Sequence, residues 1–431
     1  MHKNTLGDII MKRLAIIGLG YVGLPLAVEF SKKNIVVGFD ISQKRINELS
    51  AGHDGTLEIS EHDLQRALAN DEPNRGTLSL TSDIVTLADC DVFIITVPTD
   101  IDEFKAPDLH PLKFASRSVG GVMRRGALVI YESTTYPGCT EEVCVPELEK
   151  ASGFTFNKDF FVGYSPERIV PGDKVLGLTN IPKVTSGSTS DIALKVDELY
   201  SSIIVAGTHS APSIKVAEAS KLVENCQRDV NISFINELAY IFDRIGISVF
   251  DVLDAASTKW NFIKLIPGLV GGHCISVDPH YMVHKAQALN YHPEVITSGR
   301  RVNEKMPAFL ASKLVKEVIR LGKSPMACKC LLLGLTFKED CPDMRNSKSL
   351  ELIKELKDFG LEIEVHDPVA RLSSDLNLKI VEDFSRYDVV VLAVPHKEYL
   401  DMSFDDLLKD DKSFVFDFKR ALPDQDWILI L

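Results

Sequence analysis

Short apolar runs alternate with longer amphipathic stretches along much of this chain. In the first third, residues 13–18 (RLAIIG) form an apolar run, residues 24–33 (LPLAVEFSKK) have helical spacing, and residues 34–40 (NIVVGFD) form a second apolar run. Unbroken runs of this length are typical of strands that are buried on both faces of a parallel sheet. Similar runs at 91–97 and 127–131 continue the pattern. The N-terminal third therefore predicts a doubly wound α/β lobe.

The same order of elements returns in the last third of the chain. Residues 329–337 (KCLLLGLTF) predict a strand and a turn, residues 347–359 a helix, and residues 361–367 (LEIEVHD) a second strand that ends in Asp367. A third apolar run follows at 388–395. A second α/β lobe is therefore expected here, although its turn has one glycine in place of three.

A long helical pattern with few breakers separates the two lobes, at residues 212–245. With roughly 34 residues it is long for a helix of a globular protein, and such helices usually span domains or form a dimer seam. The expected fold class is α/β, with two Rossmann-like, doubly wound lobes joined by a central helical domain with a long helix. The expected boundaries are 1–205, 206–310 and 311–431.

The turn after the first apolar run has the sequence of a dinucleotide-binding loop. Gly18 permits a tight turn, Gly20 lets the backbone approach a pyrophosphate, and Gly23 allows the helix to pack closely on the strand. The helix N-terminus offers N–H groups to phosphates. Asp40 ends the second run and suits the ribose hydroxyls, which favours NAD over NADP. A glycine-rich turn without a ligand is the alternative, but the full order of elements favours NAD.

Threonines follow two other predicted strands at the edge that would face the cofactor. Thr99 follows residues 91–97, and Thr134 follows residues 127–131. Each hydroxyl is suited to bind nicotinamide, ribose or substrate, and a capping threonine is the alternative. The expected cofactor-binding residues of this lobe are Gly18, Gly20, Tyr21, Val22, Gly23, Asp40, Arg45, Thr99 and Thr134.

Composition narrows the possible functions. The 431-residue chain is 45% hydrophobic and 25% charged, which is typical of a globular protein. Its net charge of −13 argues against a general nucleic-acid binder, which would present a basic face. No apolar run approaches the ~18 residues of a membrane span, and residues 1–11 lack the apolar core of a secretory signal. We therefore expect a cytoplasmic protein.

Eight cysteines occur without any CxxC pair, so no metal site is expected, and most should be buried thiols. Cys274 differs because it follows a loop rich in glycine and proline at 258–273. If a helix starts near Cys274, Asp278 lies one turn along the same face and the helix N-terminus lowers the thiol pKa. Cys274 is thus a candidate nucleophile, and a buried structural cysteine is the alternative.

Two further pairs carry charge at useful spacings. Lys221 and Asn225 are four residues apart and share a face of the long helix, although a lysine there is ordinarily solvated. Lys338 and Arg345 lie in the insert 337–347 of the second lobe, where they are suited to pair with a diphosphate. Two nucleotide-like lobes imply two nucleotide ligands.

The assembled motifs resemble those of the UDP-glucose/GDP-mannose dehydrogenase family, the nucleotide-sugar 6-dehydrogenases. The resemblance extends from about residue 12 to near the C-terminus. The matching segments are GLGYVGLPLA (18–27), STTYPG (133–138), YSPERI (164–169), EASKLVEN (218–225), GGHC with Asp278 (271–278) and FKEDCPDMRNS (337–347).

The resemblance implies a four-electron oxidation of the sugar C6 by two NAD molecules, with Cys274 forming a thiohemiacetal and then a thioester that water releases. Lys221 and Asn225 would hold the developing oxyanion and a water. Asp278 would orient that water, Glu167 would serve thioester hydrolysis, and Thr134 would contact water or substrate.

The resemblance also implies that Lys338 belongs to the nucleotide-sugar domain and that Arg345 lies near the cofactor junction. We expect a homodimer through the central helix. The complete expected substrate-binding set is Glu167, Arg168, Lys221, Asn225, Gly271, His273 and Lys338.

Local differences indicate which sugar is bound. The chain reads SPERIVPG at 165–172 and VGGHC at 270–274, so that Arg168 replaces an aromatic residue and His273 a small one. Together with NCQRD (225–229) and KWNF (259–262), these segments resemble enzymes for UDP-N-acetylglucosamine or UDP-N-acetylgalactosamine in bacterial surface polysaccharide pathways. Arg168 or His273 would donate to the acetamido group.

Three alternatives remain open. A UDP-glucose 6-dehydrogenase would share the chemistry and differ in the sugar pocket. A 3-hydroxyacid-type dehydrogenase would use a lysine without a nucleophilic cysteine. A dinucleotide-sensing scaffold would bind NAD without turnover. The preference among the N-acetylhexosamines also stays open.

Overall fold

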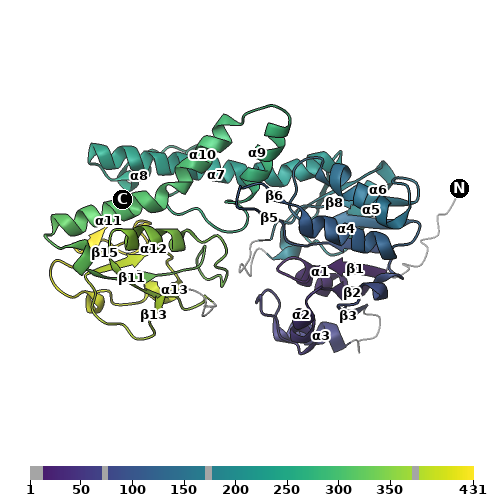
Figure 1. The fold of residues 1–431 in the computed structure, drawn as a ribbon, viewed down its shortest axis with the longest axis horizontal. Coiled ribbons are helices and arrows are strands. Elements are labelled where there is room, and N and C mark those ends of the chain that lie inside the picture. The colour runs from purple at the N-terminus through teal and green to yellow at the C-terminus, as the bar shows by residue number, and fades with distance from the viewer. Residues whose placement is uncertain (1–12, 70–75, 170–176, 371–377) are drawn as a thin grey trace. The chain divides into compact units, whose positions relative to one another are not determined.

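The structure is a computed structural model, and it describes residues 13–69, 76–169, 177–370 and 378–431. The chain divides into two compact units, an N-terminal unit (Met1–Val223) and a C-terminal unit (Glu224–Leu431). The division lies inside helix α7 (Ile214–Ile245), so this one helix belongs to both units. Figure 1 draws the first unit in purple to teal and the second in green to yellow.

The N-terminal unit is built on an eight-stranded sheet in the order β10-β9-β8-β7-β4-β1-β2-β3. All neighbours are parallel except β8 and β9. The strands are β1 (Arg13–Ile17), β2 (Ile35–Phe39), β3 (Thr77–Thr81), β4 (Val92–Ile95), β7 (Ala127–Tyr131), β8 (Phe160–Tyr164), β9 (Lys183–Gly187) and β10 (Thr208–Ser210); β5 (Asp100–Ile101) and β6 (Pro107–Asp108) form a separate hairpin.

Helices cover this sheet because its central strands are apolar on both faces. Leu14 and Ile16 of β1 pack in one cluster with residues of α1 and α6, among them Phe30 and Tyr200. The helices are α1 (Gly23–Phe30), α2 (Gln43–Ser50), α3 (Glu61–Ala69), α4 (His110–Val122), α5 (Val145–Ser152) and α6 (Ser190–Ser201), and a π-helix (Thr140–Cys144) precedes α5. The strand order reverses between β1 and β4, which is where such sheets bind dinucleotides.

The C-terminal unit repeats the same topology with six strands in the order β13-β12-β11-β14-β15-β16, all parallel. Taken in chain order, both sheets contain the arrangement 3-2-1-4-5-6. The strands are β11 (Lys329–Leu333), β12 (Glu362–His366), β13 (Lys379–Ile380), β14 (Val389–Leu392), β15 (Phe414–Phe416) and β16 (Ile428–Leu429). The two predicted Rossmann-like lobes are thereby confirmed.

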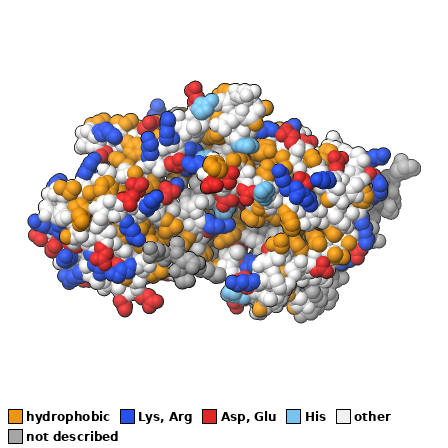
Figure 2. All heavy atoms as spheres, in the orientation of Figure 1, with side chains coloured by type: hydrophobic (Ala, Val, Ile, Leu, Met, Phe, Trp, Pro, Cys, Tyr) orange, Lys and Arg blue, Asp and Glu red, His pale blue; other side chains and the backbone are white. Residues whose placement is uncertain are grey.

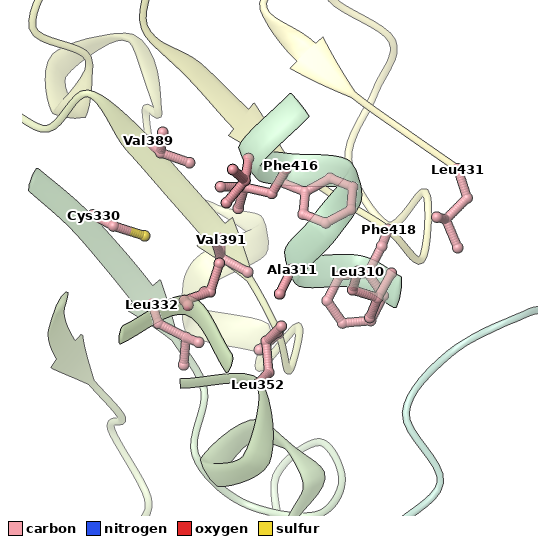
Figure 3. Packing of buried hydrophobic residues seen from close by; sticks show 14 of the residues in the cluster. Leu310, Ala311, Cys330, Leu332, Leu352, Val389, Val391, Phe416, Phe418 and Leu431 are labelled. Atoms are coloured by element: carbon pink, nitrogen blue, oxygen red, sulfur yellow. The ribbon is translucent and has the colours of Figure 1, made fainter. Parts of the chain in front are cut away.

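Two helices close one face of this second sheet. Leu310 of α11 and Leu352 of α12 pack against Leu332, Val391 and Phe416 of the strands (Figure 3). The alternate strand residues form a second cluster on the opposite face. The helices of this unit, after α7, are α8 (Val249–Ser257), α9 (Asp278–Ala288), α10 (Glu294–Glu304), α11 (Met306–Arg320), α12 (Lys348–Asp358) and α13 (Lys397–Leu400).

The surface gives no sign of a basic face on the side shown in Figure 2, where Lys and Arg side chains are interspersed with Asp and Glu. In the described parts of the chain, no helix combines the length and apolar character that a membrane span requires.

The predicted long helix at 212–245 begins two residues later, at Ile214, and ends as expected at Ile245.

Candidate active site

The C-terminal edge of the first sheet brings the glycine-rich turn and Asp40 together. Gly18 has a φ of +96°, which glycine adopts readily, and its N–H donates to Phe39 O at 2.9 Å. The Leu19 N–H donates to Asp40 Oδ2 at 3.0 Å. A Cβ on Gly23 would lie 1.8 Å from Gly18 O, whereas one on Gly20 would meet nothing within 4 Å. The turn is therefore closely packed at Gly23 and open at Gly20.

The same turn meets the first helix and Arg45. No side chain caps α1 at Val22, and both Tyr21 and Val22 are half-buried. Arg45 Nε donates to Leu19 O at 3.0 Å, and its Nη2 lies 2.7 Å from Asp54 Oδ1. Arg45 thus braces the turn. An open Gly20, an uncapped helix end and a half-exposed Asp40 fit a dinucleotide.

The two threonines lie at the same edge of the sheet. Thr99 is buried and Thr134 is half-buried. Ser133 Oγ donates to Val97 O at 2.6 Å and so links the ends of β7 and β4. Of the two hydroxyls, that of Thr134 has the greater access to solvent.

Glu218 fastens the loop after β7 to helix α7, a role that was not predicted. Its carboxylate is fully buried and accepts from Thr135 Oγ1 at 3.1 Å, from Gly138 N at 2.5 Å, and from Thr140 N and Oγ1 at 2.9 and 2.7 Å. Glu218 lies three residues before Lys221 on the same helix. The sequence signals this clasp only by an acid one turn before a candidate lysine, and it does not show that the acid is buried.

Lys221 is buried rather than solvated. Its Nζ donates to Glu167 O at 2.6 Å and lies 3.5 Å from Glu167 Oε2, and the two side chains are 7% and 13% exposed. Burial raises the pKa of the Glu167 carboxyl, and the positive charges of Lys221 and Lys183 only partly oppose that shift. Arg168, the next residue, donates from Nη1 to Pro182 O at 2.7 Å.

In the C-terminal unit, Asn225 and Asp278 meet beside Cys274. Asn225 Nδ2 donates to Asp278 Oδ2 at 2.5 Å, and Asp278 is only 1% exposed. Helix α9 begins at Asp278, four residues after Cys274, and Pro279 occupies its first turn. The Asp278 N–H still donates to Cys274 O at 2.9 Å, so Cys274 lies in the turn directly before the helix.

Cys274 also differs from the other cysteines in its exposure. It is partly exposed, whereas the remaining seven are buried. Burial raises the pKa of the nearby Cys226 thiol to about 12, so Cys226 stays protonated at neutral pH. Accessibility therefore favours Cys274 as the nucleophile.

The glycine turn before Cys274 packs on the insert of the second lobe. A Cβ on Gly271 would lie 2.5 Å from Asn346 O, and one on Gly272, whose φ is +88°, would lie 2.6 Å from the Phe337 ring. The Gly272 N–H donates to Asn346 O at 3.2 Å. Glycine is thus required at 271 and 272 for the close approach of two loops.

This packing brings His273 to the charged residues of the insert. Arg345 pairs with Asp343 through Nη2 at 2.6 Å. Burial by itself would raise the pKa of Asp343, but the hydrogen bonds and charge of Arg345, helped by His273, hold it below its ordinary value. Lys338 Nζ lies 5.8 Å from the centroid of the Phe337 ring. The expected group His273, Lys338 and Arg345 therefore comes from one cluster of loops.

Asp367 repeats the backbone contact that Asp40 makes with its turn, but it is more deeply buried. Its side chain is fully buried, and its Oδ2 accepts from Leu335 N at 2.6 Å and contacts His396 Nε2 at 3.2 Å. Burial opposes ionisation, but these contacts and further backbone amides lower the pKa of Asp367 to about 2. The second lobe keeps the dinucleotide topology, but this acid is committed to the protein instead of a ribose.

The expected site residues thus fall into two groups, each defined within its own unit. Thr134, Glu167 and Lys221 belong to the N-terminal unit, together with the glycine-rich turn. Asn225, Cys274 and Asp278 belong to the C-terminal unit, with His273, Lys338 and Arg345. Among the described residues, no three His, Cys, Asp or Glu side chains gather as metal ligands would.

The clasp around Glu218 generates a stability prediction. In Glu218→Gln an amide NH₂ replaces one carboxylate oxygen and faces donors that need acceptors, so the free energy of unfolding should fall by about 1–3 kcal/mol. Urea unfolding of the full chain measures this. Glu142→Gln, in the π-helix that follows this loop and 48% exposed, is the control and should change it by less than about 0.5 kcal/mol. Equal stability of the two variants would contradict the clasp.

Comparison with known proteins assigns the family. Three domains of the UDP-glucose/GDP-mannose dehydrogenase family match in succession: the NAD binding domain at residues 12–204, the central domain at 215–305 and the UDP binding domain at 331–424.

Relatives and solved structures match along nearly the whole chain. The UDP-N-acetyl-D-glucosamine 6-dehydrogenases of Pseudomonas aeruginosa and Salmonella typhi are 52% and 50% identical, over 96% and 95% of this chain and 98% and 96% of theirs. A solved UDP-D-ManNAc dehydrogenase from Pyrococcus horikoshii is 31% identical with a TM-score of 0.86, covering 97% of this chain and 98% of that one. The chain therefore belongs to the UDP-glucose/GDP-mannose dehydrogenase family.

Proposed function

We propose that this NAD-dependent nucleotide-sugar dehydrogenase oxidises C6 of a UDP-N-acetylhexosamine to the uronic acid through a thioester on Cys274. The observation that carries the proposal is a pair of buried contacts, one within each unit. Lys221 meets Glu167, and Asn225 meets Asp278, which begins the helix directly after the Cys274 turn. The relatives with about 50% sequence identity to this chain are named for the same class of substrate, which supports the proposal.

The proposed reaction converts a primary alcohol and one water into a carboxylate, with two NAD⁺ reduced to two NADH and three protons released. NAD bound at the glycine-rich turn supplies the hydride acceptor for each oxidation. Cys274 Sγ adds to the aldehyde carbon and retains it as a thiohemiacetal, whose oxidation gives the thioester. The covalent link prevents the aldehyde from escaping between the two oxidations.

The buried polar residues have separate tasks in this scheme. Lys221 places a fixed positive charge beside the reacting oxygen, a contribution worth roughly 10²–10³ in rate for a preorganised donor. Asn225 and Asp278 orient the water, and Asp278 accepts its proton or aligns it. Glu167, as the carboxylate, assists attack of water on the thioester. Thr134 contributes a hydroxyl at the edge of the first sheet.

Residues beside these groups support the proposed sugar. His273 lies next to the nucleophile and close to Asp343, and Arg168 follows Glu167 directly. Both are donors suited to the oxygen of a 2-acetamido group. We propose UDP-N-acetylglucosamine as the first substrate to test, with UDP-N-acetylgalactosamine next. UDP-glucose is the second candidate, because it needs the same chemistry without the acetamido contact.

The parts of the chain have proposed tasks as well. Residues 1–205 bind NAD, residues 206–310 carry the catalytic helix and the dimer contact, and residues 311–431 bind the UDP-sugar. The seven buried thiols suit a reducing compartment, so we propose the cytoplasm. The uronic acid product would serve surface polysaccharide synthesis.

An exposed apolar stripe on α7 supports a homodimer. Phe234, Ile241 and Ile245 are 56%, 44% and 62% exposed, and Val216 and Val223 are similarly exposed. At 100° per residue these five lie within about 40° of one another on the helix. A second copy of the same helix is the proposed occupant, because a self-complementary stripe is what a two-fold contact requires.

The dimer proposal predicts the effect of a charge in the stripe. Phe234→Glu should give a monomer in light scattering at a concentration where the unmodified chain is a dimer, because a buried unpaired carboxylate opposes association. Leu194→Glu is the control, since Leu194 is 63% exposed on a different helix, α6. A dimer that persists in Phe234→Glu, or a chain that is always monomeric, would contradict the proposal.

The activity is tested by the number of NADH formed. We expect two NADH per UDP-N-acetylglucosamine, a lower rate with UDP-glucose, and loss of acid formation in Cys274→Ser. The buried Cys328→Ser is the control and should retain activity. One NADH per substrate would indicate the 3-hydroxyacid type of dehydrogenase instead, and NAD binding without turnover would indicate a sensor. UDP-N-acetylgalactosamine and UDP-N-acetylmannosamine complete the panel.

A further inference from the structure

A buried ion pair lies behind Glu167, and no step of the proposed reaction uses it. Lys183 Nζ, at the start of β9, lies 2.5 Å from Glu132 Oε2, at the end of β7, and the two side chains are 4% and 0% exposed. The Tyr200 hydroxyl of α6 donates to the other Glu132 oxygen. Apolar residues of similar volume often stabilise a core as well as a buried ion pair does, so stability alone is a weak reason for the pair.

The pair is connected directly to the loop that carries Glu167. Lys183 Nζ donates to Pro166 O at 3.3 Å, and Lys221 Nζ donates to Glu167 O at 2.6 Å. Two ammonium groups from different elements therefore hold two consecutive carbonyls. Ser165 Oγ donates to Val184 O at 2.7 Å and fastens the preceding residue to the same strand β9.

The charges that face Glu167 come from three elements. Among the described residues, Lys221 of α7 and Lys183 of β9 provide positive charge, and Glu132 after β7 provides negative charge. Tyr200 contacts Glu132 as a neutral hydroxyl, and Arg168, on the loop itself, is hydrogen-bonded to a carbonyl of the segment before β9. Burial raises the pKa of Glu167, and Lys221 and Lys183 lower it. Glu132 raises the pKa of Glu167 as well, but its effect is smaller than that of Lys183.

We propose that Lys183 and Glu132 are positioning residues for Glu167, which together fix its loop and set the balance of charge at its carboxylate. The inference rests on the proposed role of Glu167 in hydrolysis of the thioester. A carboxylate that assists water must be ionised, so activity should fall at low pH as Glu167 takes up a proton. The ion pair determines the pH at which that fall occurs.

The two members of the pair should act in opposite directions. Lys183→Met removes a positive neighbour, so the carboxylate is less favoured and the acid limb of kcat should move to higher pH. Glu132→Gln removes a negative neighbour, so the acid limb should move to lower pH. A neighbouring charge shifts the pKa of a carboxyl by on the order of one unit. A purely structural role would lower the rate of both variants without moving their limbs apart.

The experiment measures kcat against pH for formation of the uronic acid, using the full chain, NAD and UDP-N-acetylglucosamine. Lys195→Met removes an exposed lysine of α6 as the control and should leave the limb unchanged. If the unmodified chain forms no acid, the proposed function fails. If it turns over but Lys183→Met and Glu132→Gln shift the limb in the same direction, or not at all, the inference is overturned.

Two further variants test the proposal in case the single substitutions prevent folding. The double variant Lys183→Met with Glu132→Gln removes both charges and leaves no unpaired ion. Its limb should move upward by less than in Lys183→Met, because Lys183 has the stronger effect on Glu167. Lys183→Arg keeps the charge and should keep the limb of the unmodified chain. Coincident limbs in the double variant and Lys183→Arg would refute the proposal.

Discussion

The central constraint on this fold is that helix α7 buries polar residues on one face. Glu218, Lys221, Asn225, Asp229 and Asn236 are all buried, and at 100° per residue they lie within about 80° of one another. A buried polar group costs free energy unless it is hydrogen-bonded. Each of these side chains therefore requires a partner, and the partners lie in loops, at the start of α9 and on α10. The exposed apolar stripe lies on the opposite face, while Leu222 and Ile235 are buried among the polar residues.

The partners of this face include the segments that carry the proposed chemistry. The loop after β7 is held by Glu218, the loop of Glu167 by Lys221, and the start of α9 by Asn225. Farther along, Asn236 both donates to and accepts from the backbone of Gly268, at 3.1 and 2.8 Å. One helix thus positions the loops of each unit through short, buried hydrogen bonds. Preorganised charge of this kind is what stabilisation of a transition state requires.

Much of the fold could be predicted from the sequence, because buried parallel strands appear as unbroken apolar runs. The turn after β1 could also be predicted, because a side chain at Gly23 would collide with the backbone of Gly18. Less of the candidate site could be predicted from the sequence. From the helical pattern alone, a lysine at 221 is expected to be solvated. Only the structure, in which Lys221 contacts Glu167, shows that it is buried. Asp367 differs from Asp40 in its burial and in its contact with His396, which is 29 residues away. No local pattern in the sequence shows either difference. The sequence leaves open where α9 begins, because the turn at Cys274 already has helical hydrogen bonding although the helix itself begins at Asp278.

The account depends on covalent attachment of the substrate to one sulfur atom. The most direct test is mass spectrometry of Glu167→Gln, acid-quenched during turnover with UDP-N-acetylglucosamine and NAD. In this variant hydrolysis of the thioester should be slowed while both oxidations proceed. The account therefore predicts a UDP-N-acetylhexosaminuronyl adduct, bound as a thioester, on the peptide that contains Cys274. Turnover without any adduct, or an adduct on another cysteine, would contradict it.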